Sequence, residues 1–258
     1  STPKPSSAAS DVYKRQLWGP KARSILASLM AQPEDISHEN LPFATAKQIE
    51  VQGIPVWAFR ISYVGEQGWE LYIPFEYGLR LWDILYGAGV TPVGIETYAS
   101  SRRLEKSLRL QNANLLTDYN LYEADLARKL VKKASFHGKE AYVDQRKLEE
   151  QAAYLCTLTM LDNKDAFGME RYPVGEWPIL HKDTKEVLVD GKGRRSFSTD
   201  IAFGPSLGVN ILMAYIPSEH ATVGNEFLLE YFCEYYPVRL EAVGYRALID
   251  PENERPKT

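Results

Sequence analysis

The chain has 258 residues, a net charge of −4 and a hydrophobic content of 45%, the balance of a globular protein with room for one large domain or two ordinary ones. This charge gives no electrostatic footprint for nucleic acid, and no apolar run approaches the length of a membrane span. The two cysteines, Cys156 and Cys233, are far apart and form no metal or redox motif, so we expect a cytoplasmic protein.

The first 16 residues are predicted to lie outside the fold. Ser, Pro and Ala dominate residues 1–10, a composition typical of disorder. The next six residues, "DVYKRQ", look like the translation of a transposon end used in sequencing libraries. We therefore expect the natural sequence to begin near Leu17 and a first domain to span residues 17–150.

A helix followed by a β-hairpin is predicted for the first part of this domain. Apolar residues recur at helical spacing in residues 19–30, and Pro20 suits a first helical turn. "IPVWAFRISYV" alternates, which places four of its residues on one face of a strand: Trp57, Phe59, Ile61 and Tyr63. "GEQG" supplies the connection to a returning strand, "WELYIP".

The returning strand carries an acidic residue inside an apolar run. Its parity directs Trp69, Leu71 and Ile73 to one face and Glu70 and Tyr72 to the other. Glu70 can therefore line a cavity while its neighbours pack in the core. The alternative is that Glu70 belongs to the solvated face of an edge hairpin.

Two helices are predicted next. "EYGLRLWDILYGAG" has the helical pattern of a helix stopped by glycines, and the residues expected to point inward are Leu79, Trp82, Ile84 and Leu85. In residues 96–112, Leu104 and Leu108 stand one turn apart. The charged side chains of that helix expected at the surface are Arg103, Glu105 and Lys106.

The pattern changes near residue 150. A short helix is predicted around residues 139–151, and short β-type runs separated by Gly, Pro and Asp turns follow from Ala152, with "DGKG" as a hairpin signal. We expect residues 151–258 to form a separate antiparallel barrel or sandwich. The four histidines have no metal-ligand spacing, so no metal site is predicted.

Three motifs, in order and at matching spacing, resemble one family. "SYVGEQGWELYIP" resembles the Gly-Tyr-Thr-Gly-Glu-Asp-Gly-Phe-Glu signature of the glycine-cleavage T-protein, or aminomethyltransferase, family. "SRRLEKSLRL" and "FHGKEAYVDQ" resemble the family's Arg-Leu-Glu helix and its Phe-Ile-Gly-Lys-Glu-Ala segment. The resemblance covers residues 17–258. It implies an α+β, aminomethyltransferase-like folate-binding fold with a C-terminal antiparallel β-barrel, and tetrahydrofolate as cofactor.

Within this family, "GIETYASSRRLEKSLRLQNANLLTDYNLYEADLAR" looks most similar to the tetrahydrofolate-dependent O-demethylases of vanillate and syringate. That likeness implies a methyltransferase that O-demethylates lignin-derived methoxyaromatics of the vanillate, syringate or 3-O-methylgallate type and moves the methyl group to N5 of tetrahydrofolate. Its partner would be a small methoxyaromatic molecule, with no nucleic acid or membrane involved. The oligomeric state stays open.

The resemblance also implies roles for individual residues. Glu70 matches the second Glu of the signature, which accepts hydrogen bonds from the paired N–H groups of the pterin ring. Tyr63 matches the signature's tyrosine and either packs in the core or stacks on a ligand and donates a proton. Trp69 either belongs to the core or walls the ligand site.

One position departs from the family pattern. T-proteins carry an Arg 29 residues after the folate-binding Glu, and Ala99 stands there in this chain. The change argues against glycine cleavage and makes Tyr98 a candidate substrate-facing, catalytic residue. Arg102 and Arg103 are either surface charges or the cations that hold an aryl carboxylate.

Three other functions remain open. The chain could be a T-protein, the folate-binding part of a larger methylamine-type dehydrogenase, or a folate-binding module without catalysis. The resemblance further implies that the family's key acidic residue lies upstream of Leu17. We therefore expect this fragment to fold partly and not to turn over substrate by itself.

Overall fold

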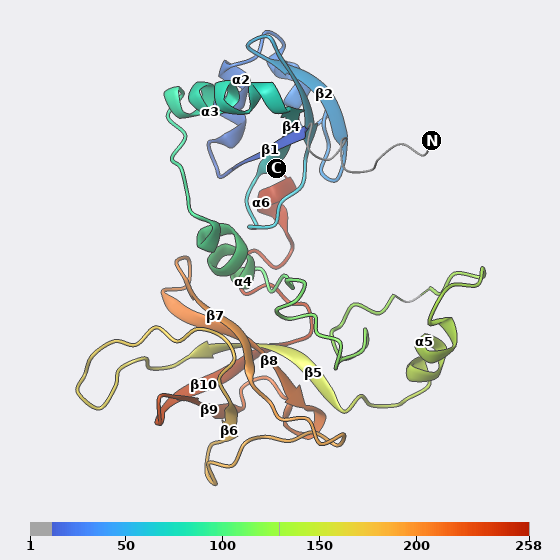
Figure 1. Ribbon diagram of the computed structural model, residues 1–258, viewed down its shortest axis with the longest axis vertical. Coiled ribbons are helices and arrows are strands. Elements are labelled where there is room, and N and C mark those ends of the chain that lie inside the picture. The colour runs from blue at the N-terminus through green and yellow to red at the C-terminus, as the bar shows by residue number, and fades with distance from the viewer. Residues whose placement is uncertain (1–11, 129, 258) are drawn as a thin grey trace. The chain divides into compact units, whose positions relative to one another are not determined.

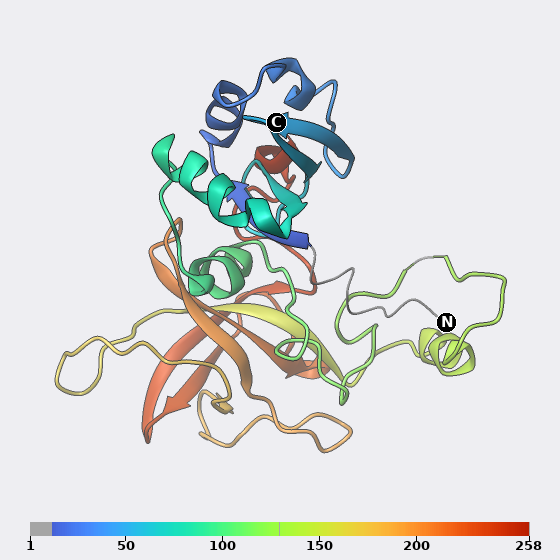
Figure 2. The same ribbon diagram turned by 45° about the horizontal axis from the view of Figure 1, so that its top comes forward.

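The structure, a computed structural model, describes residues 12–128 and 130–257. It divides into two compact units, Ser1–Tyr98 with Asp250–Thr258, and Ala99–Ile249. Each unit has its own sheet and its own core, and Figures 1 and 2 show their elements from two directions. Within the described residues, no helix combines the length and the apolar character needed to cross a membrane.

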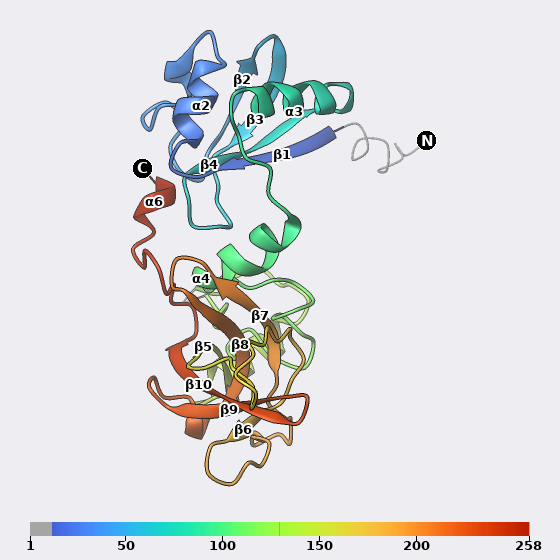
Figure 3. The same ribbon diagram turned by 90° about the vertical axis from the view of Figure 1, so that its left-hand side faces the viewer.

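The first unit is a four-stranded antiparallel sheet of order β1-β4-β3-β2. Helices α2 and α3 lie on one side of this sheet (Figure 3), and the predicted helix and hairpin are confirmed. The elements are β1 (Val12–Trp18), α2 (Ala22–Ser28), the 3-10 helix η1 (Pro33–Ile36), β2 (Ala46–Val51), β3 (Ile54–Phe59), β4 (Gly68–Pro74), the 3-10 helix η2 (Phe75–Tyr77), α3 (Gly78–Gly87) and α6 (Glu254–Lys257).

The strand β4 has the predicted parity. Trp69, Leu71 and Ile73 are all at most 1% exposed and belong to the core, whereas Glu70 and Tyr72 lie on the outer face. Strand β3 also has the predicted alternation, and its Ala58 side is covered by the core while its aromatic side is open. Trp57, in particular, is 51% exposed.

Residues 12–16 are part of the fold, contrary to the prediction, whereas residues 1–11 lie outside the described residues. Strand β1 pairs with β4 along its whole length, from Val12 opposite Pro74 to Trp18 opposite Gly68. The strands approach so closely at Gly68 that a Cβ atom there would collide with the carbonyl oxygen of Leu17. Residues 12–16 thus pair with β4 and continue the strand that contains Leu17.

Helix α3 confirms two of the four residues predicted to point inward, since Leu85 is buried and Ile84 packs against the core. Leu81 and Leu85 are buried, but Leu79 is 71% and Trp82 is 41% exposed. Only a narrow stripe of this short helix packs against the sheet. Trp82 instead faces a surface cavity, described below.

A fully buried arginine, Arg60, connects the C-terminal helix α6 to the rest of the first unit. Arg60 donates hydrogen bonds to the carbonyl oxygens of Leu41 at 2.9 Å and of Lys257 at 2.8 Å, and its Nη1 lies 3.2 Å from Nδ1 of His38. Helix α6 is therefore bonded to the unit that contains the four-stranded sheet.

The second unit begins at Ala99, inside the segment 96–112 for which a helix is predicted. In the structure this helix is shorter than predicted. A π-helix, η3 (Thr97–Arg102), leads into α4 (Arg103–Glu105), where the helix ends. The charged residues expected at its surface, Arg103, Glu105 and Lys106, are at most 1% exposed. They are buried because distant parts of the unit supply their partners: Asp200 for Arg103, the backbone N–H of Ser206 for Glu105 and the carbonyl oxygen of Ile249 for Lys106.

The main sheet of this unit has six antiparallel strands in the order β6-β9-β10-β5-β8-β7. It curls, and an isolated bridge between Pro178 and Phe197 links the segments beside its two edge strands (Figure 2). This is a curled antiparallel half-barrel; the closed barrel stays a prediction. The strands are β5 (Ala153–Met160), β6 (Ile179–His181), β7 (Ser198–Gly204), β8 (Val209–Pro217), β9 (Glu226–Tyr231) and β10 (Glu234–Val243), with the 3-10 helix η4 (Ser218–His220) between β8 and β9.

The units meet in sequence at Tyr98 and Ala99, whereas we expected a boundary near residue 150. Leu104 and Ala124 share a core cluster with Leu155, Ile211 and Met213 of the six-stranded sheet. The segment before residue 150 therefore packs with the sheet that follows it. Helix α5 (Lys139–Arg146), which confirms the predicted short helix, lies apart from this sheet (Figures 1 and 2).

Candidate functional site: a carboxylate on the open face of the first sheet

The Glu70 side chain is only 14% exposed and is enclosed by polar partners from β1 and β4. Its Oε1 accepts hydrogen bonds from Nε2 of Gln16 at 3.0 Å and from Nζ of Lys14 at 3.3 Å. Its Oε2 accepts one from the hydroxyl of Tyr72 at 2.7 Å. Strand pairing produces this set, since Gln16 stands opposite Glu70 and Lys14 stands opposite Tyr72.

These partners keep the carboxylate ionised. Burial raises the pKa of Glu70, but the hydrogen bonds from Tyr72 and Gln16 and the charge of Lys14 outweigh burial and leave the pKa below its ordinary value. The hydrogen bond to Glu70, together with burial, raises the pKa of Tyr72 to about 12. At neutral pH the site therefore presents an anionic acceptor flanked by a neutral phenol.

Four of the predicted site residues line one small pocket together with Gln16. These are Tyr63, Trp69, Glu70 and Tyr98. The rings of Tyr63 and Tyr98 lie 5.4 Å apart at 46°, and burial raises the pKa of Tyr98 against the effect of a hydrogen bond with Gln16. The pocket has a volume of about 10 Å³, room for roughly one water molecule.

The roles of these four residues differ. Trp69 is 1% exposed and belongs to the hydrophobic core, on the side of β4 opposite to Glu70. It supports the strand that carries the carboxylate. Tyr63 and Tyr98 provide an aromatic wall next to the carboxylate.

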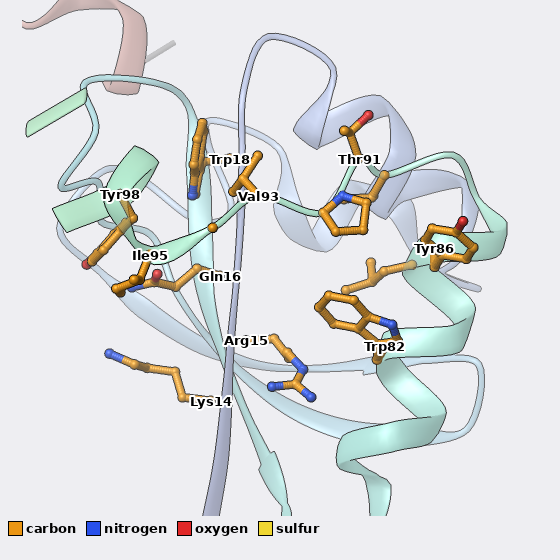
Figure 4. A pocket seen from close by; sticks show the side chains of 14 residues that line it. Lys14, Arg15, Gln16, Trp18, Trp82, Tyr86, Thr91, Val93, Ile95 and Tyr98 are labelled. Atoms are coloured by element: carbon orange, nitrogen blue, oxygen red, sulfur yellow. The ribbon is translucent and has the colours of Figure 1, made fainter. Parts of the chain in front are cut away.

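A larger cavity of about 280 Å³ adjoins this pocket and shares Gln16, Trp18 and Tyr98 with it. It runs along β1 between α3 and residues 90–95. Figure 4 shows Gln16 directed toward Tyr98 and Arg15 directed toward Trp82, on opposite sides of β1. The Arg15 guanidinium lies 5.2 Å from the Trp82 ring, a cation–π contact.

The two predicted substrate arginines, Arg102 and Arg103, lie in the second unit and not in this pocket. Arg102 donates to Oε2 of Glu105 at 2.7 Å, and Arg103 forms a buried ion pair with Asp200. Their charges are thus compensated within the unit. The structure gives no support to a role for them in holding an aryl carboxylate.

The sequence analysis missed the three hydrogen-bond donors that hold Glu70. Tyr72 had a signal, since it shares the outward parity of Glu70 two residues away. Lys14 and Gln16 had none, because their segment was excluded from the fold. Across residues 12–128 and 130–257, no group of three His, Cys, Asp or Glu side chains is arranged to hold a metal ion.

The motifs, the sheet and the pocket agree with one protein family. The profile of the GCVT N-terminal domain family matches residues 6–134, half of the 258 residues, and the chain belongs to this family.

Two kinds of curated relative share this similarity. The chain is 32% identical over 225 residues to mitochondrial dimethylglycine dehydrogenase of Homo sapiens, which covers 85% of this chain and 24% of that protein. It is 32% identical over 221 residues to an aminomethyltransferase of Symbiobacterium thermophilum, which covers 81% of this chain and 52% of that protein. The chain thus spans about half the length of one relative and about a quarter of the other.

A solved structure shows the same fold. The crystal structure of glycine cleavage system aminomethyltransferase T from Bartonella henselae matches with a TM-score of 0.69 and 22% identity, over 92% of this chain and 60% of that chain.

Proposed function

We propose that this chain is the folate-binding part of a tetrahydrofolate-dependent one-carbon transfer enzyme of the aminomethyltransferase or dimethylglycine dehydrogenase kind. Membership of the GCVT family and the two kinds of relative support this choice. They favour the aminomethyltransferase alternative over O-demethylation of methoxyaromatics, since the relatives reported above are named for other substrates. O-demethylation stays a finer prediction that rests on the sequence resemblance alone.

The observation that carries the proposal is the ionised, half-enclosed carboxylate of Glu70 beside two tyrosine rings. A pterin ring presents an N–H group and an exocyclic amine side by side. A carboxylate accepts both, and such charge-assisted pairs fix orientation as well as affinity. Tyr63 and Tyr98 then offer aromatic surface to the ring plane.

Ligand entry requires local rearrangement of this pocket. A space of about 10 Å³ does not admit a bicyclic ring. Both donors to Oε1, Gln16 and Lys14, come from the edge strand β1, and Lys14 is 45% exposed. The two N–H groups of the ligand would displace these donors, one bonding to Oε1 and the other to the second lone pair of Oε2, beside the hydrogen bond from Tyr72. Glu70 would hold and orient the pterin, and the bound tetrahydrofolate would supply the nitrogen that carries the one-carbon unit.

The test is a titration of the purified chain with 5-formyltetrahydrofolate, followed by calorimetry. The control ligand, N-(4-aminobenzoyl)-L-glutamate, lacks the pterin. We expect saturable binding of the folate and at least about tenfold weaker binding of the control, given that hydrogen bonds to charged groups contribute about 1.5–3 kcal/mol. Equal affinities, or no saturable folate binding, would contradict the proposal.

A second assay tests the O-demethylase reaction. The chain is incubated with tetrahydrofolate and 4-hydroxy-3-methoxybenzoate, and the folate products are analysed. Formation of 5-methyltetrahydrofolate with the methoxybenzoate would restore the O-demethylase function and overturn the expectation that the fragment does not turn over.

A further inference from the structure

The phenol of Tyr72 donates a hydrogen bond to Glu70, and its position is fixed from two sides. Its hydroxyl lies 2.7 Å from Oε2, and its ring meets the Phe59 ring at 4.8 Å. Phe59 stands opposite Glu70 on the neighbouring strand, and Trp57 stands opposite Tyr72. The four side chains therefore form a two-by-two block on the open face of β3 and β4.

The two oxygens of Glu70 have different surroundings. Oε1 faces the two β1 donors, one of which is the half-exposed Lys14. Oε2 faces a phenol on its own strand, which is braced by a neighbouring ring. A donor on β1 can be exchanged for a ligand donor, whereas Tyr72 can leave only if its own strand or the Phe59 contact gives way.

We propose that Tyr72 is a positioning residue, which holds Oε2 of Glu70 so that the carboxylate faces the paired N–H donors of the folate. The inference rests on the proposed function, because it concerns the ligand of the same carboxylate. Two roles follow from the one hydrogen bond. It removes the rotational freedom of the Glu70 side chain, and it stabilises the ionised form that accepts N–H groups.

The protonation role gives a readout that a merely structural role would not change. Among the causes that act on the pKa of Glu70, burial raises it and the Tyr72 hydrogen bond is the first of those that lower it. In Tyr72→Phe the burial remains and this hydrogen bond is gone, so the pKa of Glu70 rises. Folate binding requires the ionised carboxylate, and the acid limb of binding must therefore move to higher pH.

The experiment measures the dissociation constant of 5-formyltetrahydrofolate between pH 4 and pH 8 for the wild type, Tyr72→Phe, Glu70→Gln and the double variant. We expect Tyr72→Phe to weaken binding at pH 7 by about two- to tenfold, the equivalent of one neutral hydrogen bond, and to shift the acid limb upward. In the Glu70→Gln background, Tyr72→Phe should have no further effect on the pH profile.

The matched control is Tyr77→Phe, in the same unit but away from the pocket; it should keep the wild-type profile. An unchanged acid limb in a folded Tyr72→Phe protein would overturn the inference. A wild type that does not bind folate would overturn the proposed function instead, so the two failures are distinguishable. Circular dichroism of each variant establishes that it is folded.

Discussion

The rings of Tyr63 and Tyr98 lie 5.4 Å apart and line the same pocket as Glu70, although 34 intervening residues separate them in sequence. An aromatic pair of this kind contributes about 0.5–1.5 kcal/mol beyond area burial. Tyr98→Ala removes the ring, and we expect it to weaken folate binding by about three- to tenfold, the equivalent of that energy. Tyr98→Phe keeps the ring and should stay within about twofold of the wild type. Titration calorimetry distinguishes the variants, and equal losses in both would assign the effect to the hydroxyl.

We expect replacement of Arg60 to lower the stability of the protein without changing its affinity for folate. Its guanidinium is fully buried and bonds to the carbonyl oxygens of Leu41 and Lys257. We expect Arg60→Met to lower the free energy of unfolding by about 2–4 kcal/mol, because two charge-assisted hydrogen bonds are lost. Limited proteolysis should then cut the released C-terminal segment sooner. The exposed Arg80, which donates a hydrogen bond to the Gln52 carbonyl, serves as control, and Arg80→Met should stay within about 0.5 kcal/mol of the wild type.

The buried pair of Arg103 and Asp200 tests the earlier substrate prediction. Replacing one partner leaves an uncompensated buried charge, so Asp200→Asn should destabilise the second unit by about 3–5 kcal/mol. Chemical denaturation measures this loss. Folate affinity of the folded protein should not change. A binding loss in Arg102→Gln at unchanged stability would contradict this account and return the arginines to the ligand site.

A second buried cluster predicts acid sensitivity. Burial raises the pKa values of Glu123 and Asp190, but hydrogen bonds from Arg194 dominate and leave both pKa values below the ordinary range. Since the folded pKa is depressed, the stabilisation is fully present above the unfolded pKa values of about 4 and is lost as the pH falls through the folded values.

Urea unfolding between pH 7 and pH 2.5 measures this acid sensitivity. Stability should be level near neutral pH and fall below about pH 4. In Arg194→Gln the fall should be shallower, from a lower starting stability. Equal slopes for both proteins would show that the Arg194 contacts do not set the acid limit.

Local patterns predicted the strand that carries the site. Alternation alone assigned Trp69, Leu71 and Ile73 to one face of β4 and Glu70 to the other, and both are confirmed. Alternation does not say which face is covered, and so the sequence left open whether the aromatic side of β3 is buried or exposed. The covering helices, α2 and α3, are determined by the whole unit and not by the strand.

Long-range partners limited the prediction elsewhere. Lys106 is buried because its ammonium donates a hydrogen bond to the carbonyl oxygen of Ile249, 143 residues later. No pattern near Lys106 in the sequence predicts this partner. Strand β10 contains Pro237, a residue type that weakens the strand pattern in the sequence. The strand nevertheless pairs with β5 on one side and with β9 on the other. The donors to Oε1 of Glu70 were missed for a different reason, since the segment that carries them resembles the translation of a transposon end and was excluded from the fold.

The affinity of 5-formyltetrahydrofolate for Glu70→Gln tests the central claim most directly. The matched control is Glu50→Gln, an exposed carboxylate on the same outer face of the same sheet, in β2. We expect Glu70→Gln to weaken binding by at least about tenfold, because a charge-assisted pair is lost, and Glu50→Gln to bind like the wild type. Wild-type affinity in a folded Glu70→Gln protein would contradict the assignment of this carboxylate to the pterin.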